Sequence, residues 1–381
     1  MLGTIAFFVL NALEGGFKVY FLVLLPVLYS AGIIDVVAIG YLGASFVVAL
    51  MAGAATVSYI LHNTSSLKTI RISVAIGLIA STILLFGYLH HNVFFIAVSY
   101  MVMGYATGLL VTTSGAIAGM LTKPGARFHR LAQLAMIKDV VRILVPALLA
   151  TLVAIHQIPL FIAFIALSII AVYVCSFLLP HLSTEAQQSS LGNGSLFKNK
   201  NFLRVVLVEF LDSVASAPLF VFVPLIFLAR GYSVSDSIIL QSAIFAGYLI
   251  GRWFIALLSS RWSGWRAVGI AELGMAGSIV ILLLLQNYYV LLFMCIILGV
   301  FTRGTSPAIK ALAFDTLSQE NLKRGNGIFV VAGDGGSAVG QMLFGFLAAW
   351  LGFQSPFWTA VIIVLTVAGI CFARVTASSS K

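Results

Sequence analysis

The sequence predicts an all-α integral membrane protein, and three observations lead to that fold class. Of the 381 residues, 61% are hydrophobic and only 8% are charged, whereas soluble domains carry about 25% charged residues. The mean hydropathy is +1.12, and the apolar runs are long enough to cross a hydrocarbon layer of ~30 Å as helices. Barrel strands would instead alternate apolar and polar residues with a period of two. We therefore expect a multi-pass protein of a cell membrane, with the bacterial inner membrane as its location.

Twelve transmembrane helices are expected where apolar runs are separated by polar breaks. In the first half of the chain these runs lie near residues 3–31, 36–60, 69–88, 93–121, 129–155 and 158–180. In the second half they lie near residues 202–229, 236–259, 266–286, 288–317, 325–350 and 355–374. The stretch 182–201 is polar, rich in Gly and Ser and without periodicity, which is typical of a flexible linker. It would join an N-terminal six-helix half at 1–181 to a C-terminal six-helix half at 202–381.

Basic residues in the predicted connections indicate the orientation. The odd-numbered connections contain Arg230 alone. The even-numbered connections and the C-terminus contain the others: Lys68, Arg71, Lys123, Arg127, Arg130, Lys198, Lys200, Arg204, Arg261, Arg266, Lys323, Arg324, Arg374 and Lys381. Basic residues gather in cytoplasmic loops, so we expect a cytoplasmic linker and both termini in the cytoplasm. The net charge of +10 is interpreted in the same way rather than as a sign of nucleic-acid binding.

The two halves have similar patterns of polar residues. A single alignment superposes Pro26 on Pro224, Asn11 on Glu209, and Glu14 on Asp212. In the fifth and eleventh predicted helices, Asp139 and Asp334 each follow a basic residue at a similar distance. Two such matches in a chain with few charges predict a six-helix repeat.

Ionisable side chains inside the predicted helices are the strongest functional signal. A charge at bilayer depth costs several kcal/mol, about 2.5–3.5 by insertion assays, so such groups face a bundle interior or a wet cavity. The candidates for substrate binding are Lys18, Lys138, Arg142, Arg252, Arg303, Lys310 and Asn11. The candidates for proton coupling are Glu14, Asp139, Glu209, Asp212 and Asp334.

Helical spacing suggests which of these groups meet. Glu14 and Lys18 are four residues apart with the acid first, which favours an ion pair on one helix. Glu209 and Asp212 are three residues apart, so their carboxyl groups can approach closely and compete for a proton. Both pairs also have a structural interpretation: Glu14 could merely neutralise Lys18, and the two acids could be counter-ions of Arg303 or Arg252.

Twelve helices, a central linker, internal termini and a six-plus-six repeat resemble the major facilitator superfamily of secondary transporters. The short motifs match less well, since "HNTSSLK" at 62–68 has Asn63 where the family has an acid, although Lys68 is kept. The loop "SSRWSGWR" keeps Gly264 and Arg266, and Pro146 is what remains of the antiporter signature of helix 5. The resemblance implies alternating access of two halves about a central cavity. It also implies a peripheral position for the helix at 266–286, so Glu272 is interpreted as structural or near an interface. Gating or conformational roles are expected for Lys68, Gly264, Arg266, Asp315 and Arg324.

These observations predict a secondary active transporter, not an enzyme. We expect proton-coupled export (efflux by proton antiport) of a small anionic or carboxylate-bearing solute, and citrate-type siderophores are one such group. Proton-coupled uptake of an organic anion, multidrug efflux and, in a different class, a polytopic membrane enzyme are the alternatives.

The expected partners are the solute, protons and the lipid bilayer, with no nucleic acid, and the chain is expected to function as a monomer. No cofactor is expected, and Cys175, Cys295 and Cys371 lie within apolar runs as small buried hydrophobes, with no disulfide or metal site.

Overall fold

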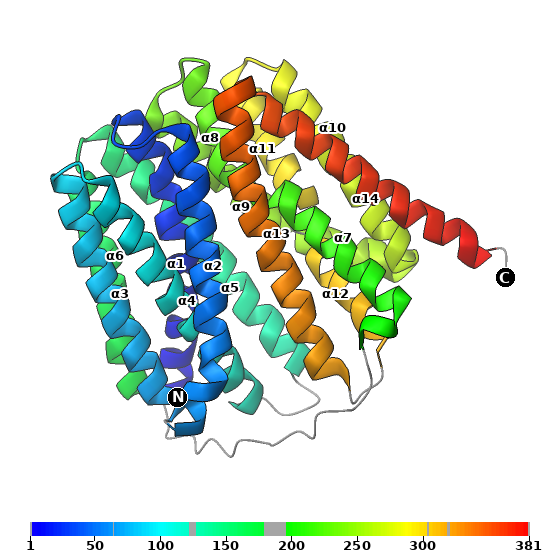
Figure 1. Ribbon diagram of the computed structural model, residues 1–381, viewed down its shortest axis with the longest axis horizontal. Coiled ribbons are helices and arrows are strands. Elements are labelled where there is room, and N and C mark those ends of the chain that lie inside the picture. The colour runs from blue at the N-terminus through cyan, green and yellow to red at the C-terminus, as the bar shows by residue number, and fades with distance from the viewer. Residues whose placement is uncertain are drawn as a thin grey trace. The chain divides into compact units, whose positions relative to one another are not determined.

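A computed structural model describes residues 2–63, 65–121, 127–178, 196–302, 305–317 and 321–379. Every regular element in these ranges is a helix (Figure 1). The chain divides into two compact units. The first comprises Met1–Gln188 with Ser233–Ser242, and the second comprises Ser189–Tyr232 with Ala243–Lys381.

The first unit is built from long helices that follow one another closely along the chain. They are α1 (Leu2–Ser30), α2 (Val36–Asn63), α3 (Ser66–Leu89), α4 (Val93–Leu121), α5 (Arg127–Ala154) and α6 (Ile158–Phe177). The second unit begins with the short 3-10 helix η2 (Leu196–Lys198). Its helices are α7 (Lys200–Ser216), α8 (Leu219–Ala229), α9 (Val234–Arg261), α10 (Gly264–Leu284), α11 (Tyr288–Thr302), α12 (Thr305–Asp315), α13 (Leu322–Leu351) and α14 (Ser355–Ser379). The first residues of α9 belong to the first unit.

The helices coincide with ten of the predicted apolar runs to within a few residues. The run at 288–317 contains two helices, α11 and α12, and the run at 202–229 is also interrupted. It contains α7 and α8, which are separated at Ala217 and Pro218. Ala217 and Pro218 keep helical backbone angles, but proline has no N–H to donate, so the hydrogen-bond ladder of the helix is interrupted at this point. Within the described residues, ten helical stretches are long and apolar enough to cross a membrane, and α7 with α8 supply one of them. The twelve-span topology and the cytoplasmic termini remain predictions.

Glycines bring pairs of helices together within the first unit. A Cβ atom added to Gly108 of α4 would lie 2.1 Å from the carbonyl oxygen of Leu50 on α2, and one added to Gly104 would lie 2.2 Å from that of Phe46. Gly53 of α2 is equally close to the α4 backbone. Small residues permit this close approach of two helix backbones, so α2 and α4 contact each other through their main chains.

The second unit repeats this arrangement. Gly247 and Gly251 of α9 lie against the backbone of α11, and Gly299 of α11 lies against α9. In the first unit α1 packs on α5 and α6, and α3 packs on α6; in the second, α7 packs on α13 and α14, and α10 packs on α14. The same order of packing therefore occurs twice along the chain.

Two tyrosines fix the position of α1. Tyr100 of α4 is fully buried and donates a hydrogen bond of 2.5 Å to the carbonyl oxygen of Phe21. Tyr20, on α1 itself, donates to the hydroxyl of Ser168 on α6 at 3.2 Å. Both bonds lie in the half of α1 after Glu14. They hold this helix at a defined rotation, and so direct the earlier polar residues of α1 toward α4 and α5.

Arg230 connects the end of α8 to the end of α10 in the second unit. Its Nη1 donates to the carbonyl oxygens of Leu282 and Leu285, at 3.2 and 3.1 Å, and its Nη2 donates to that of Leu283 at 2.7 Å. The last carbonyls of a helix have no partner within the helix, and a cation near them is favoured by the helix dipole. Arg230 therefore caps α10 from outside.

Candidate functional site

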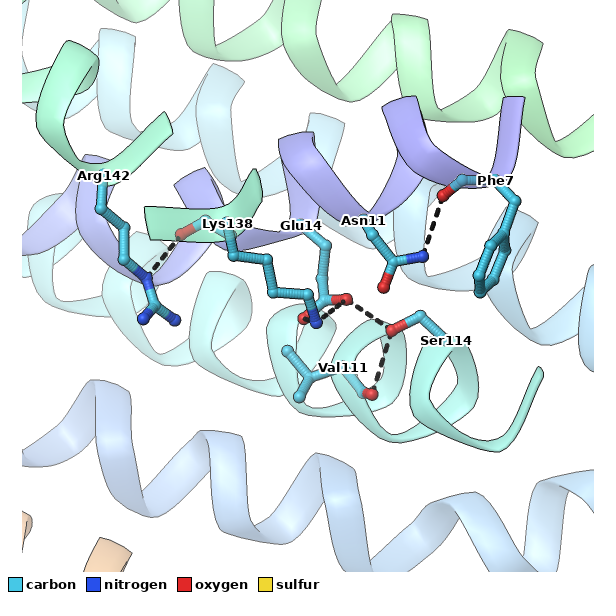
Figure 2. A network of polar contacts seen from close by, with 8 residues as sticks. Phe7, Asn11, Glu14, Val111, Ser114, Lys138 and Arg142 are labelled. Atoms are coloured by element: carbon cyan, nitrogen blue, oxygen red, sulfur yellow. Dashed lines mark hydrogen bonds and ion pairs between the residues drawn. The ribbon is translucent and has the colours of Figure 1, made fainter. Parts of the chain in front are cut away.

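The polar residues of the first unit meet around Glu14, which is only 3% exposed. Lys138 of α5 donates from Nζ to both carboxylate oxygens of Glu14, at 2.8 and 2.7 Å. Ser114 of α4 donates a third hydrogen bond to Glu14 Oε2. Figure 2 shows the three side chains converging from α1, α4 and α5. A buried carboxylate is stable when it is paired and hydrogen-bonded, and this network supplies both conditions.

A second ion pair lies along α5. Arg142 donates from Nη1 to Asp139 Oδ1 at 3.0 Å, one turn earlier on the same helix, and Asp139 is 1% exposed. The Nε of Arg142 donates to the carbonyl oxygen of Gly15 at 3.4 Å (Figure 2). Together with the first pair, this pair joins α1 to α5 by charged contacts inside the unit.

Gly15 makes this junction possible. A Cβ atom at Gly15 would lie 2.7 Å from the Cβ of Lys138, closer than real side chains approach, so a larger residue would push α5 away from α1. Asn11, one turn before, is 1% exposed and donates from its side chain to the carbonyl oxygen of Phe7 at 2.9 Å (Figure 2). Its amide oxygen remains able to accept a hydrogen bond.

The two ion pairs leave donors unused. The site contains two acids, Glu14 and Asp139, and two bases, Lys138 and Arg142, so its formal charge is zero. Lys138 has three N–H bonds and uses two of them here. The Nη2 group of Arg142 has no partner among the described residues. The side chains of Lys138 and Arg142 are 20% and 25% exposed, so these bases are only partly covered by the rest of the chain.

In the second unit the acids of α7 lie next to an acid of α10. Glu209 and Asp212 of α7 are 5% and 2% exposed, and Glu272 of α10 is fully buried. Glu272 interacts electrostatically with both Asp212 and Glu209. Lys310 of α12 interacts electrostatically with Glu209. This cluster lies in the second unit, as the Glu14 network lies in the first.

The other predicted residues have less defined surroundings. Arg252 and Asp334 are partly buried on α9 and α13. Lys68, Arg266 and Asp315 are exposed, and Gly264 begins α10 with its Cα close to the side chain of Leu312. Arg303 and the side chains of Lys18 and Arg324 lie outside the described part of the structure. The predicted pair between Glu14 and Lys18 therefore stays a prediction, whereas the pairing of Glu14 with Lys138 is a new finding.

Sequence reasoning missed two members of these clusters. Ser114 is one of many serines in apolar helices, and nothing in its spacing sets it apart. Glu272 was assigned a structural role at the periphery, but the structure buries it against the acids of α7. Its signal was a lone acid in a strongly apolar helix, which by itself marks a functional candidate. Among the described residues no group of three or more His, Cys, Asp or Glu side chains could hold a metal ion.

Comparisons with known proteins give the same fold. The family model of the Major Facilitator Superfamily matches residues 205–381, which is the C-terminal half of the chain. No protein of curated function matches the sequence significantly.

Solved membrane transporters match nearly the whole chain in structure. A D-xylose–proton symporter is 14% identical with a TM-score of 0.81, and 97% of this chain and 96% of that chain are covered. The nucleoside transporter NupG is 14% identical with a TM-score of 0.82, and 98% and 99% are covered. A bacterial homolog of the human lysosomal transporter Spinster, inward-facing and unoccupied, is 12% identical with a TM-score of 0.76, and 97% and 95% are covered. The chain therefore has the fold of these transporters.

Proposed function

We propose that this chain is a secondary active transporter that moves a small carboxylate-bearing solute across the membrane by alternating access. The proposal starts from the fold, which it shares with proteins that transport a sugar and nucleosides, and from the C-terminal match to the Major Facilitator Superfamily. Because a fold alone does not define a function, the observation that carries the proposal is the buried network of Glu14, Lys138, Asp139 and Arg142. Ionisable groups within membrane helices mark substrate or ion pathways.

The chemistry of the network favours a carboxylate. The Nη2 edge of Arg142 and the third N–H of Lys138 are donors on basic side chains, and a guanidinium binds carboxylates in a planar, two-point geometry. Both bases already have one carboxylate partner each, so a solute carboxylate would compete with Glu14 and Asp139. Such competition gives the solute a way to loosen the contact between α1 and α5. Asn11, Lys18, Arg252, Arg303 and Lys310 complete the proposed set of substrate-binding residues.

Export driven by protons is the proposed direction, and citrate-type siderophores are the proposed solute group. The proton-coupling candidates are Glu14, Asp139, Glu209, Asp212 and Asp334, and the gating candidates are Lys68, Gly264, Arg266, Asp315 and Arg324. Proton-coupled uptake of an organic anion and multidrug efflux are the alternatives within the same class. A polytopic membrane enzyme is the alternative of another class, and it would require catalysis by the purified protein without net movement of a solute.

Reconstitution tests the proposal. The purified protein is first screened for thermal stabilisation by di- and tricarboxylates, and the best ligand is then used in proteoliposomes with an imposed pH gradient. Arg142→Ala should lower the transport rate by about 10- to 150-fold, which corresponds to one charge-assisted hydrogen bond of roughly 1.5–3 kcal/mol. Arg204→Ala, at an exposed position at the start of α7, is the matched control and should transport normally.

The outcomes separate the alternatives. Wild-type transport by Arg142→Ala would refute the role of the α1–α5 network. Accumulation of the solute in everted membrane vesicles energised with protons supports export, and accumulation only in right-side-out vesicles supports uptake. A protein that binds carboxylates but never moves them in proteoliposomes would contradict the transporter proposal itself.

A further inference from the structure

Helices α3 and α6 pack against each other in the first unit and leave a long apolar surface uncovered (Figure 1). Only 39% of the apolar span of α3 and 33% of that of α6 is buried inside the protein. Exposed apolar patches of this extent mark sites of interaction with a membrane or a partner. Large side chains that are more than 40% exposed follow both helices: Ile72, Ile79, Phe86, Leu167, Val174 and Phe177.

Two basic residues lie at one end of this surface. Lys68 and Arg71 are in the first two turns of α3, three residues apart and therefore neighbours on the helix. The Nε of Arg71 donates to the hydroxyl of Ser176, a fully buried residue of α6, at 3.3 Å. The guanidinium carbon of Arg71 lies 4.0 Å from the centre of the Phe177 ring, within the range of a cation–π contact. These two contacts with α6 hold the guanidinium at the edge of the apolar surface.

The positive charge at this end of the surface is not balanced by the two helices that form it. The sequences of α3 and α6 contain no Asp and no Glu. Among the described residues, neither Lys68 nor Arg71 forms an ion pair. Ser176 uses the Nε of Arg71, so Nη1 and Nη2 provide the remaining N–H donors of the guanidinium. A ligand that binds to these donors must supply negative charge.

The second unit contains only one of these two bases. The alignment of the two halves superposes Lys68 on Arg266 and Arg71 on Gly269. The local structure agrees with this alignment, because the backbone N–H groups of Lys68 and Arg266 each donate to the hydroxyl of the serine that caps the helix, at 3.4 Å. A Cβ atom at Gly269 would lie 3.1 Å from the ring of Phe372 on α14. The chain thus provides an internal comparison between a paired and a single base.

We propose that Lys68 and Arg71 bind the phosphate of an anionic phospholipid, such as phosphatidylglycerol, whose acyl chains lie along α3 and α6. A phosphate accepts several charged hydrogen bonds at once, and its geometry matches the donors of a guanidinium. Basic groups between membrane helices are known to bind anionic headgroups. The apolar surface beside the two bases favours a lipid over a soluble phosphate, because a soluble phosphate would leave that surface uncovered.

Native mass spectrometry of the purified full-length protein in detergent measures the binding. Phosphatidylglycerol and phosphatidylcholine with the same acyl chains are titrated separately, so that only the headgroup differs. The wild type should bind phosphatidylglycerol more tightly than phosphatidylcholine. Arg71→Gln should weaken the binding of phosphatidylglycerol by about fivefold, and the double variant Lys68→Gln, Arg71→Gln by about 25-fold, since each base near an anionic headgroup contributes ~1 kcal/mol. Neither variant should change the binding of phosphatidylcholine.

The single base of the second unit supplies the matched control. Arg266→Gln should leave the binding of phosphatidylglycerol within about twofold of the wild type, because a lone base offers fewer donors to a phosphate. An equal loss in Arg266→Gln and Arg71→Gln would overturn the site, as would equal binding of both lipids by the wild type. Displacement of phosphatidylglycerol by millimolar glycerol 1-phosphate would assign the two bases to a soluble phosphate and refute the lipid.

Photolabelling locates the lipid without any variant, so the proposal stays testable even if Arg71→Gln does not fold. Phosphatidylglycerol with a diazirine in one acyl chain is irradiated with the wild-type protein, and mass spectrometry of the peptides identifies the adducts. They should lie in peptides from α3 or α6 and should disappear when unlabelled phosphatidylglycerol is added in excess. Adducts confined to other helices would contradict the assignment. No readout requires transport, so this proposal and the transporter proposal can fail separately.

Discussion

Replacing Lys138 by Met tests how the first unit tolerates its buried acid. The substitution keeps the length of the side chain and its apolar stem but removes the ammonium that donates to both oxygens of Glu14. The carboxylate of Glu14 would then keep only the hydrogen bond from Ser114. Glu14 is 3% exposed in the wild-type structure, so water could not replace the lost ammonium. Breaking a buried pair by removing one partner costs about 3–5 kcal/mol.

The cost arises from the burial of Glu14. A carboxylate in the core that loses its ion-pair partner keeps the cost of desolvation without the compensating attraction. The double variant Glu14→Gln, Lys138→Met removes both charges, so it should avoid most of this cost.

Thermal unfolding of the purified protein in detergent at pH 7, at one heating rate, measures this effect. The midpoint of Lys138→Met should lie well below that of the wild type, and the double variant should recover most of the loss. If Lys138→Met unfolds at the wild-type temperature, the ion pair does not stabilise the unit and the reasoning is wrong.

Three further predictions concern the packing of the helices, and each is checked by the same thermal unfolding measurement. Arg230→Met should destabilise the protein by about 2 kcal/mol, because three carbonyls at the end of α10 lose a charged donor. Burial lowers the pKa of Arg230, but an arginine stays charged near neutral pH. The loss of stability should therefore not vary between pH 6 and 8. Gly108→Ala should lower the stability by about 3 kcal/mol, because the new Cβ would overlap the α2 backbone. Gly277→Ala is the control: it has open space around its Cβ and should raise the stability by about 0.5–1 kcal/mol. Tyr100→Phe should cost about 1 kcal/mol through the lost hydrogen bond to Phe21, and an unchanged midpoint would show that this bond does not hold α1.

The positions of the helices could be predicted from the sequence, because apolar runs of membrane length end at polar breaks. The partners of the charged residues could not. Helical periodicity predicts contacts only between residues that are close in sequence, such as Glu14 and Lys18. Lys138 is 124 positions from Glu14 along the chain, so periodicity could not predict their pairing. Which residue of α5 faces α1 depends on how closely the two backbones approach, and Gly15 sets that distance. The sequence contained Gly15, but its neighbour across the contact was visible only in three dimensions.

The acids of the second unit show the same limit. The spacing of Glu209 and Asp212 on one helix predicted that two carboxyl groups could meet. In the structure, both acids also interact electrostatically with Glu272, on a helix that was expected to be peripheral. The rotation of α10 about its axis determines this contact, and a helix that is apolar on all sides carries little information about its own rotation.

Glycines hold α2 against α4 and α9 against α11. These glycine positions tolerate fewer substitutions during evolution than other positions of the chain. At Gly108 or Gly247 any side chain would collide with a neighbouring main chain, so these sites are closed to substitution whatever the function of the protein. The charged residues Glu14, Lys138 and Glu272 lie on other helices, where a changed side chain alters local contacts and leaves the glycine-packed pairs intact. Under the proposed function, a lineage could therefore change its solute by replacing a few residues on α1, α5, α7 and α10 without rebuilding the fold. In the laboratory, those four helices are the place to direct a mutant library for altered specificity.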